Sequence, residues 1–249
     1  MQQNSELIPS RLRAQLLAAG IPAWKHNHEG LLRLFPRSFN VDAIGLDTHD
    51  LAEVLIHLVT RGIVATSETG TLTSVKKVEP GWHFCQFYRD DAQLLTMVAP
   101  YIAEGLKSGE GCFWVLPSST TTDAACDALA ASIDDVEHYL ADGRLELGIH
   151  RDWYLDSSSK MKSFEEIATA LLAKQDKALS KGLKFLRAAG DAGWVSGTEQ
   201  SKAFIDYENK VNAALGSTKV AAVCTFRAGV SADELVEIVA AHQNALQSA

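Results

Sequence analysis

The chain has 249 residues, of which 47% are hydrophobic, and a formal net charge of −8. These values predict a packed globular protein of one or two domains. The negative charge argues against a general binder of nucleic acids or anionic membranes, because both functions need clustered Lys and Arg.

The four cysteines lie far apart along the chain, without a C-x-x-C pair. In a chain of this length, such spacing does not predict a disulfide framework. The opening residues M-Q-Q-N-S-E are polar, and no run approaches the roughly 18 apolar residues of a membrane span. We therefore expect a reduced, cytoplasmic protein that does not enter the membrane.

Residues 1–78 are predicted to form a small, mainly helical unit that resembles a winged helix. A strong amphipathic helix is expected at 46–61, and Gly62 ends it. Two β-rich runs then flank a turn at 68–70, which predicts a hairpin. The apolar stripe of the helix consists of Leu51, Val54, Leu55 and Leu58.

Residues 79–249 are predicted to form an α/β domain in which strands and helices alternate. Two of the strand runs, C-F-W-V-L and V-A-A-V-C-T-F, are almost continuously apolar, as expected of strands that are buried on both faces. The alternation implies right-handed crossovers and a mostly parallel sheet with helices on both faces. The expected strands are 82–87, 111–116, 144–149, 183–188 and 220–226. The expected helices are 91–107, 122–141, 164–181, 199–214 and one from 232.

The loops that follow these strands predict a ligand site. Ligands of open parallel sheets bind beyond the carboxyl ends of the strands. Aromatic, arginine and aspartate residues are concentrated in these loops, which suits an organic molecule with an apolar body and a polar group. The residues that we expect near this crevice include Tyr88, Arg151, Trp153 and Trp194.

A nucleotide site is not predicted at the first turn of the sheet. That turn has the sequence F-Y-R-D-D, which places two acidic side chains where phosphates would need to be neutralised. Neither G-x-x-x-x-G-K-[ST] nor G-x-G-x-x-G occurs in the chain. No G-x-S-x-G motif supports a serine nucleophile either, so we expect a protein that is not an enzyme.

His83 and Cys85 lie two residues apart on the first strand and are expected to face the same way. Both side chains could reach one metal ion. Structural zinc sites, however, take four ligands, and only two are close in sequence here. The alternative is that both residues are part of the core, with Cys85 as a small apolar residue.

The second unit contains five short motifs: H-F-C-Q-F-Y at 83–88, G-L-K-S-G-E-G-C-F-W-V-L-P at 105–117, R-D-W-Y-L at 151–155, G-D-A-G-W at 190–194 and D-Y-E at 206–208. With these motifs, residues 82–249 resemble the sensory domain of DcmR-type regulators, also called MEDS after methanogens and methylotrophs. The chain departs from the family pattern at 240–244, where it has A-A-H-Q-N in place of a His-Pro sequence.

The resemblance implies a RecA-like or KaiC-like domain without a phosphate loop, which senses small hydrocarbon derivatives. It assigns the His-x-Cys pattern of the family to His83 and Cys85, and its aromatic residue to Tyr88. In DcmR-like regulators this domain accompanies a DNA-binding helix. The corresponding helix here carries Asp50 and Glu53, and acidic side chains are not typical of a helix in the major groove.

We therefore expect a cytoplasmic sensory protein that binds a small organic ligand and forms a homodimer through its N-terminal unit. Two alternatives stay open: a ligand-responsive transcription regulator that binds DNA, and a metal or redox sensor. No cofactor is expected apart from a metal ion in the last case. The predicted ligand-binding residues are His83, Cys85, Tyr88, Arg151, Trp153 and Trp194, and the predicted metal ligands are His83 and Cys85.

Overall fold

The computed structural model describes residues 8–18, 23, 29, 31, 46–60, 78–195, 200–227, 230 and 232–242. The predicted hairpin around 68–70 lies outside these ranges, and so does most of the predicted winged helix. The second domain falls almost entirely within them.

The second domain is built on a five-stranded sheet in which all neighbouring strands are parallel, in the order β1-β5-β4-β2-β3. The predicted α/β fold with a parallel sheet is therefore confirmed. The fourth strand begins three residues later than the sequence predicts, because the turn after the preceding helix continues to Lys184. The strands are β1 (His83–Tyr88), β2 (Gly111–Leu116), β3 (Leu145–Ile149), β4 (Leu186–Asp191) and β5 (Val220–Arg227).

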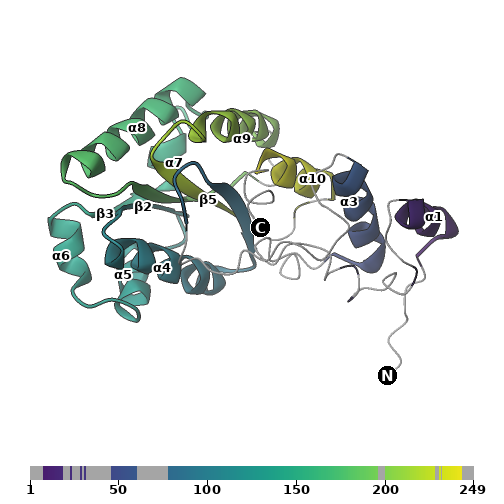
Figure 1. Ribbon diagram of the computed structural model, residues 1–249, viewed down its shortest axis with the longest axis horizontal. Helices are drawn as coiled ribbons and strands as arrows, with labels where there is room; N and C mark the ends of the chain where they lie inside the picture. Colours follow the sequence, from purple (N-terminus) through teal and green to yellow (C-terminus); the bar gives the residue numbers. More distant parts are fainter. Residues whose placement is uncertain are drawn as a thin grey trace.

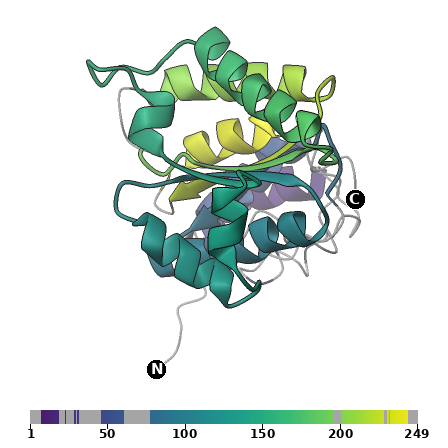
Figure 2. The same ribbon diagram turned by 90° about the vertical axis from the view of Figure 1, so that its left-hand side faces the viewer.

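Helices cover both faces of the sheet, as the two layers on either side of the strands in Figure 2 show. On one face lie α8 (Phe164–Ser180), α9 (Ser201–Leu215) and α10 (Ala232–Ala241). On the other face lie α4 (Asp91–Lys107), α5 (Thr122–Ala130) and α6 (Val136–Ala141). Each layer encloses its own apolar core.

Strand β1 distributes its side chains between the two cores. Cys85 and Phe87 belong to the core under α8, α9 and α10, whereas Phe84 and Tyr88 belong to the core under α4. Because successive side chains of a strand alternate, His83 lies on the same face as Cys85. This agrees with the predicted common orientation of the two residues.

Two helical segments differ from the sequence prediction. The helix expected at 122–141 is divided into α5 and α6, because Asp135 adopts a left-handed backbone (φ 54°) and caps α6 through His138 N. The residues after β3 form the short helix α7 (His150–Tyr154), where a loop was expected.

The G-L-K-S-G-E block at 105–110 has a structural role in this fold. Glu110 forms a buried, two-pronged ion pair with Arg187 of β4, with Arg187 Nε 2.5 Å and Nη2 3.1 Å from the carboxylate oxygens. A Cβ atom at position 105 would lie 2.8 Å from the Arg187 side chain and from Cys112 Sγ. Glycine is required there because the arginine passes directly over the helix backbone.

The N-terminal helices α1 (Ser10–Ala18) and α3 (Thr48–Thr60) pack against each other, and α3 packs against α10. Figure 1 shows α10 between α9 and α3. Leu51, Val54 and Leu55 are fully buried and share a core with α10. These three residues of the stripe are therefore covered within the chain. The domain boundary at 78/79 stays a prediction.

Among the helices that the structure describes, none combines the length and apolar character needed to cross a membrane.

Candidate functional site

The carboxyl ends of β1 and β4 meet at a buried hydrogen bond. Tyr88 Oη donates to Asp191 Oδ1 over 2.6 Å, and Gly193 N donates to the same oxygen over 3.2 Å. Burial raises the pKa of Asp191 to about 6, against the opposing effect of the Tyr88 hydrogen bond. The second oxygen, Oδ2, is buried without a hydrogen-bond partner. This carboxyl group can therefore accept one further bond.

Trp194 is the centre of an aromatic group beside this turn. Its ring stacks on His150 of α7, with centroids 5.6 Å apart, and lies 5.9 Å from the Tyr154 ring and 5.7 Å from Phe204 of α9. His150 Nδ1 in turn accepts a hydrogen bond from Ser118 N over 3.2 Å. The indole Nε1 is buried without a hydrogen-bond partner.

The turn after β1 places a carboxylate of the chain itself at the N-terminus of α4. The Asp90 carboxylate caps α4 by accepting from Gln93 N over 2.8 Å, and Arg89 N donates to Gln93 Oε1. A phosphate at the helix N-terminus would compete with this carboxylate for the same positive dipole. The geometry agrees with the predicted lack of a phosphate cradle.

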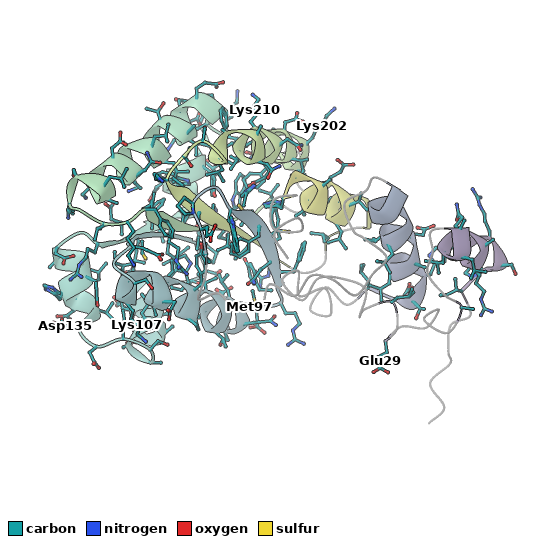
Figure 3. The ribbon with its side chains drawn as sticks, viewed as in Figure 1. Glu29, Met97, Lys107, Asp135, Lys202 and Lys210 are labelled. Atoms are coloured by element: carbon teal, nitrogen blue, oxygen red, sulfur yellow. The ribbon has the colours of Figure 1, made fainter. Side chains whose placement is uncertain are left out.

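A second polar cluster lies inside the core, near the beginning of β1. It contains His83 of β1, Cys224 of β5, Glu208 of α9 and His242, which directly follows α10. All four residues are buried, and three are completely inaccessible. Figure 3 shows Lys202 and Lys210 of the same helix α9 on the outer surface of the domain.

The Glu208 carboxylate is the common partner in this cluster. Its Oε2 atom lies 3.0 Å from His83 Nε2, 3.4 Å from His242 Nε2 and 3.5 Å from Cys224 Sγ. The Cys224 sulfur is 3.4 Å from His83 Nε2. The two imidazole rings have centroids 4.1 Å apart and are tilted by 32° relative to each other. Four potential metal-ligand atoms thus converge on one point.

Burial and mutual charge shift the protonation equilibria of the cluster in different directions. Burial opposes ionisation of Glu208, but the two imidazoles outweigh it and lower the pKa of this carboxyl to about 2. Burial, aided by His242, lowers the pKa of His83. Burial and the Glu208 charge raise the pKa of the Cys224 thiol well above its usual range. The cluster therefore combines a buried carboxylate with a neutral thiol.

This arrangement does not resemble a cysteine nucleophile with its base. In a catalytic triad, the base and the orienting carboxylate use different nitrogens of the histidine. Here Cys224 and Glu208 both approach Nε2 of His83. A raised thiol pKa and the burial of Cys224 also disfavour attack on a substrate.

Comparison with family models decides the relationship. Residues 82–243, more than half of the chain, match the model described as "MEthanogen/methylotroph, DcmR Sensory domain". The chain belongs to the MEDS family. The match covers both the strand-end turn and the buried cluster, and it confirms the family that the sequence motifs indicate.

One solved structure similar to the chain is the KaiC-like protein PH0186 from Pyrococcus horikoshii OT3. It has 14% sequence identity and a TM-score of 0.46, over 64% of this chain and 68% of that one. Comparison with curated proteins gave no match.

The MEDS domain does not bring the six predicted site residues to one place. His83 begins β1 whereas Tyr88 ends it, which separates them by roughly 16 Å at the usual rise of a strand. Trp153 packs against Phe113, with ring centroids 4.6 Å apart, rather than against Trp194. Arg151 is exposed on α7. The strand-end group thus keeps Tyr88 and Trp194 of the predicted set.

Cys85 is buried beside the polar cluster of the MEDS domain but is not one of its four converging residues. It pairs with Cys224 across β1 and β5, and the charge on Glu208 raises its pKa after the larger effect of burial. Of the two predicted metal ligands, His83 therefore belongs to the cluster, whereas Cys85 lies next to it.

Sequence reasoning missed the roles of Glu208, Cys224 and His242 in the MEDS domain. Glu208 entered the sequence analysis only as part of the D-Y-E motif at 206–208, and it is fully buried. The spacing contained a signal, because the apolar stripe of α9 runs through positions 204, 208, 211 and 215. A lone carboxylate on such a stripe predicts a buried partner. His242 belongs to the A-A-H-Q-N sequence that departs from the family pattern.

Proposed function

We propose that the chain is a sensory protein whose MEDS domain binds a small organic molecule at the strand ends and whose N-terminal unit responds to it. The family to which the chain belongs is described as a sensory domain, which supports the sensory role. The ligand and the response are inferred from the geometry.

The observation that carries the ligand proposal is the pair of buried, unpartnered polar atoms in one turn, Asp191 Oδ2 and Trp194 Nε1. Buried polar atoms are normally hydrogen-bonded, and an unsatisfied one costs about 1–3 kcal/mol. Asp191 Oδ2 can accept a hydrogen bond, and the indole N–H can donate one. A short alcohol or primary amide carries both complementary groups, and its alkyl part would meet the aromatic rings around Trp194.

Transmission to the N-terminal unit would use the aromatic side chains beneath the turn. Phe204 contacts Trp194 and also Phe226 of β5, and Phe226 meets the His242 ring with centroids 5.8 Å apart. Helix α10, which ends beside His242, packs against α3. A ligand transmits a signal only if it binds one arrangement of these parts more tightly than another.

The test is thermal unfolding of the full chain with a series of short alcohols and primary amides. We expect at least one compound to raise the melting temperature in a concentration-dependent manner. Trp194→Phe, which removes the indole N–H but keeps an aromatic ring, should weaken this effect at least tenfold in apparent affinity. Trp153→Phe is the matched control and should retain it.

Two results would contradict the ligand site. One is that no compound in the series stabilises the wild-type chain. The other is that Trp194→Phe and Asp191→Asn respond to the active compound just as the wild type does.

A further inference from the structure

We propose that His83, Glu208, Cys224 and His242 form a zinc site inside the MEDS domain. These residues come from four different elements, namely β1, α9, β5 and the end of α10. The site lies at the opposite end of β1 from the strand-end turn, so it is distinct from the site of the proposed organic ligand.

The spacing of the four ligand atoms fits one tetrahedral ion. Zinc binds imidazole nitrogen and carboxylate oxygen at about 2.0–2.2 Å and thiolate sulfur at about 2.3 Å, which places tetrahedral ligands roughly 3.3–3.6 Å apart. The four distances described above run from 3.0 to 3.5 Å. All four ligand atoms lie within 4.8 Å of one another.

The orientation of His242 supports a metal more directly. Its Nδ1 atom lies 2.6 Å from the Ile238 carbonyl oxygen. A carbonyl can only accept, so Nδ1 carries a proton, and Nε2 is the nitrogen that faces the Glu208 carboxylate 3.4 Å away. Nε2 is buried without a hydrogen-bond partner. A metal ion between Nε2 and the carboxylate would bind both groups.

A backbone carbonyl behind a histidine is also a frequent arrangement around protein-bound metals. It fixes the tautomer and aims the other nitrogen at the ion. On the other side of the cluster, Asn212 of α9 lies near His83, and both its Oδ1 and His83 Nδ1 are buried without a hydrogen-bond partner. A small rotation of this amide would allow it to support His83 in the same way.

The donor set selects the kind of ion. Two neutral imidazoles, one carboxylate and one thiolate carry two negative charges in total, which balance a divalent cation in this enclosed place. Sulfur and nitrogen donors disfavour Mg²⁺ and Ca²⁺, which prefer oxygen ligands. Four protein ligands without an open position are typical of structural rather than catalytic zinc. An ion here would fix α9 and α10 to the sheet.

The experiment is elemental analysis of the full chain, purified without an affinity tag, incubated with Zn²⁺ and dialysed extensively. We expect close to one zinc per chain. Cys224→Ser and Glu208→Gln should lower the retained zinc at least tenfold. Cys85→Ser is the matched control, because it removes a buried thiol from the same face of the sheet without removing a ligand, and it should retain the metal.

Loading with Co²⁺ gives spectroscopic evidence on the ligands from the wild-type chain itself, so this measurement does not depend on whether a variant folds. When the wild-type chain is loaded with Co²⁺, we expect the visible absorption of a tetrahedral ion and a sulfur-to-cobalt charge-transfer band. The charge-transfer band should persist in Cys85→Ser. Its loss in Cys85→Ser together with persistence in a folded Cys224→Ser chain would overturn the assignment.

The proposal is also overturned if the dialysed wild-type chain contains no stoichiometric zinc, or if Glu208→Gln and Cys224→Ser retain it fully. These outcomes do not affect the organic ligand, which is tested by the response of Trp194→Phe. Far-UV circular dichroism establishes that each compared variant is folded.

Discussion

At the strand ends, one residue, Asp191, is expected to make the stability of the fold depend on pH. Burial raises the pKa of Asp191 to about 6, and the nearby Asp91 adds to this, whereas Tyr88 and Arg227 oppose it. The unfolded carboxyl titrates near 3.9. Between these values the folded state keeps a proton that the unfolded chain loses, so its stability falls as the pH rises.

The predicted loss is about 2 kcal/mol in the free energy of unfolding between pH 4 and pH 7. Urea unfolding of the wild type and Asp191→Asn across this interval measures it, since the amide can still accept from Tyr88 but does not titrate. The difference between the two proteins should shift in favour of Asp191→Asn as the pH rises. A constant difference would show that Asp191 does not titrate in this range.

A second prediction concerns the buried pair of Glu110 and Arg187. Arg187 also donates to the Tyr101 carbonyl oxygen and lies over the Tyr101 ring, so it is held on several sides. Glu110→Ala leaves a buried guanidinium without its counter-charge, which should cost about 3–5 kcal/mol in urea unfolding. The control is Lys177→Ala, which removes a half-exposed partner of Glu146 and should cost about 1 kcal/mol or less.

The difference between what the sequence predicted and what it missed is also visible in single residues. His83 and Tyr88 could be singled out because they stand in a short family motif. Glu208, Cys224 and His242 could not be grouped, because they are far apart in the chain and become neighbours only when α9 and α10 pack on β1 and β5. Convergence of this kind is a property of the tertiary structure.

At the scale of elements, local signals located most of the second domain. Helix α4 and strand β2 have the predicted bounds, since a capping Asp90 begins the helix and a continuous apolar run defines the strand. The division between α5 and α6 depends on one left-handed residue, Asp135. A left-handed turn at a non-glycine residue leaves only a weak trace in the sequence, so the prediction gave one long helix.

The turn after β4 provides a prediction at this scale. A Cβ atom at position 193 would collide with the Tyr88 hydroxyl and lie 3.1 Å from Asp191 Oδ1. Gly193→Ala should therefore displace the Tyr88–Asp191 hydrogen bond and destabilise the domain by about 1–3 kcal/mol.

The matched control for this variant is Gly216→Ala, because nothing lies within 4 Å of the added methyl group there. Thermal and urea unfolding of both variants measures the effect. Equal stability of the two would mean that the turn can move aside without loss of its hydrogen bonds.

At the scale of the whole molecule, α10 is the element that joins the two predicted units. It packs against α9 in the MEDS domain and against α3 in the N-terminal unit. The proposed zinc site would hold the end of α10, and the aromatic contacts from Trp194 reach the same place through Phe226 and His242. Both proposed sites would therefore bear on the helix that α3 contacts.

The alternative of DNA binding is tested at this scale as well. Asp50 and Glu53 lie at partly exposed positions of α3, whereas Leu51, Val54 and Leu55 are buried. Phosphate contacts require clustered basic side chains and are strongest at low salt. We therefore expect that the full chain, with or without bound zinc, does not retard a labelled mixture of promoter-length DNA fragments at about 50 mM salt. Retardation of these fragments at this salt concentration would instead favour the transcription regulator.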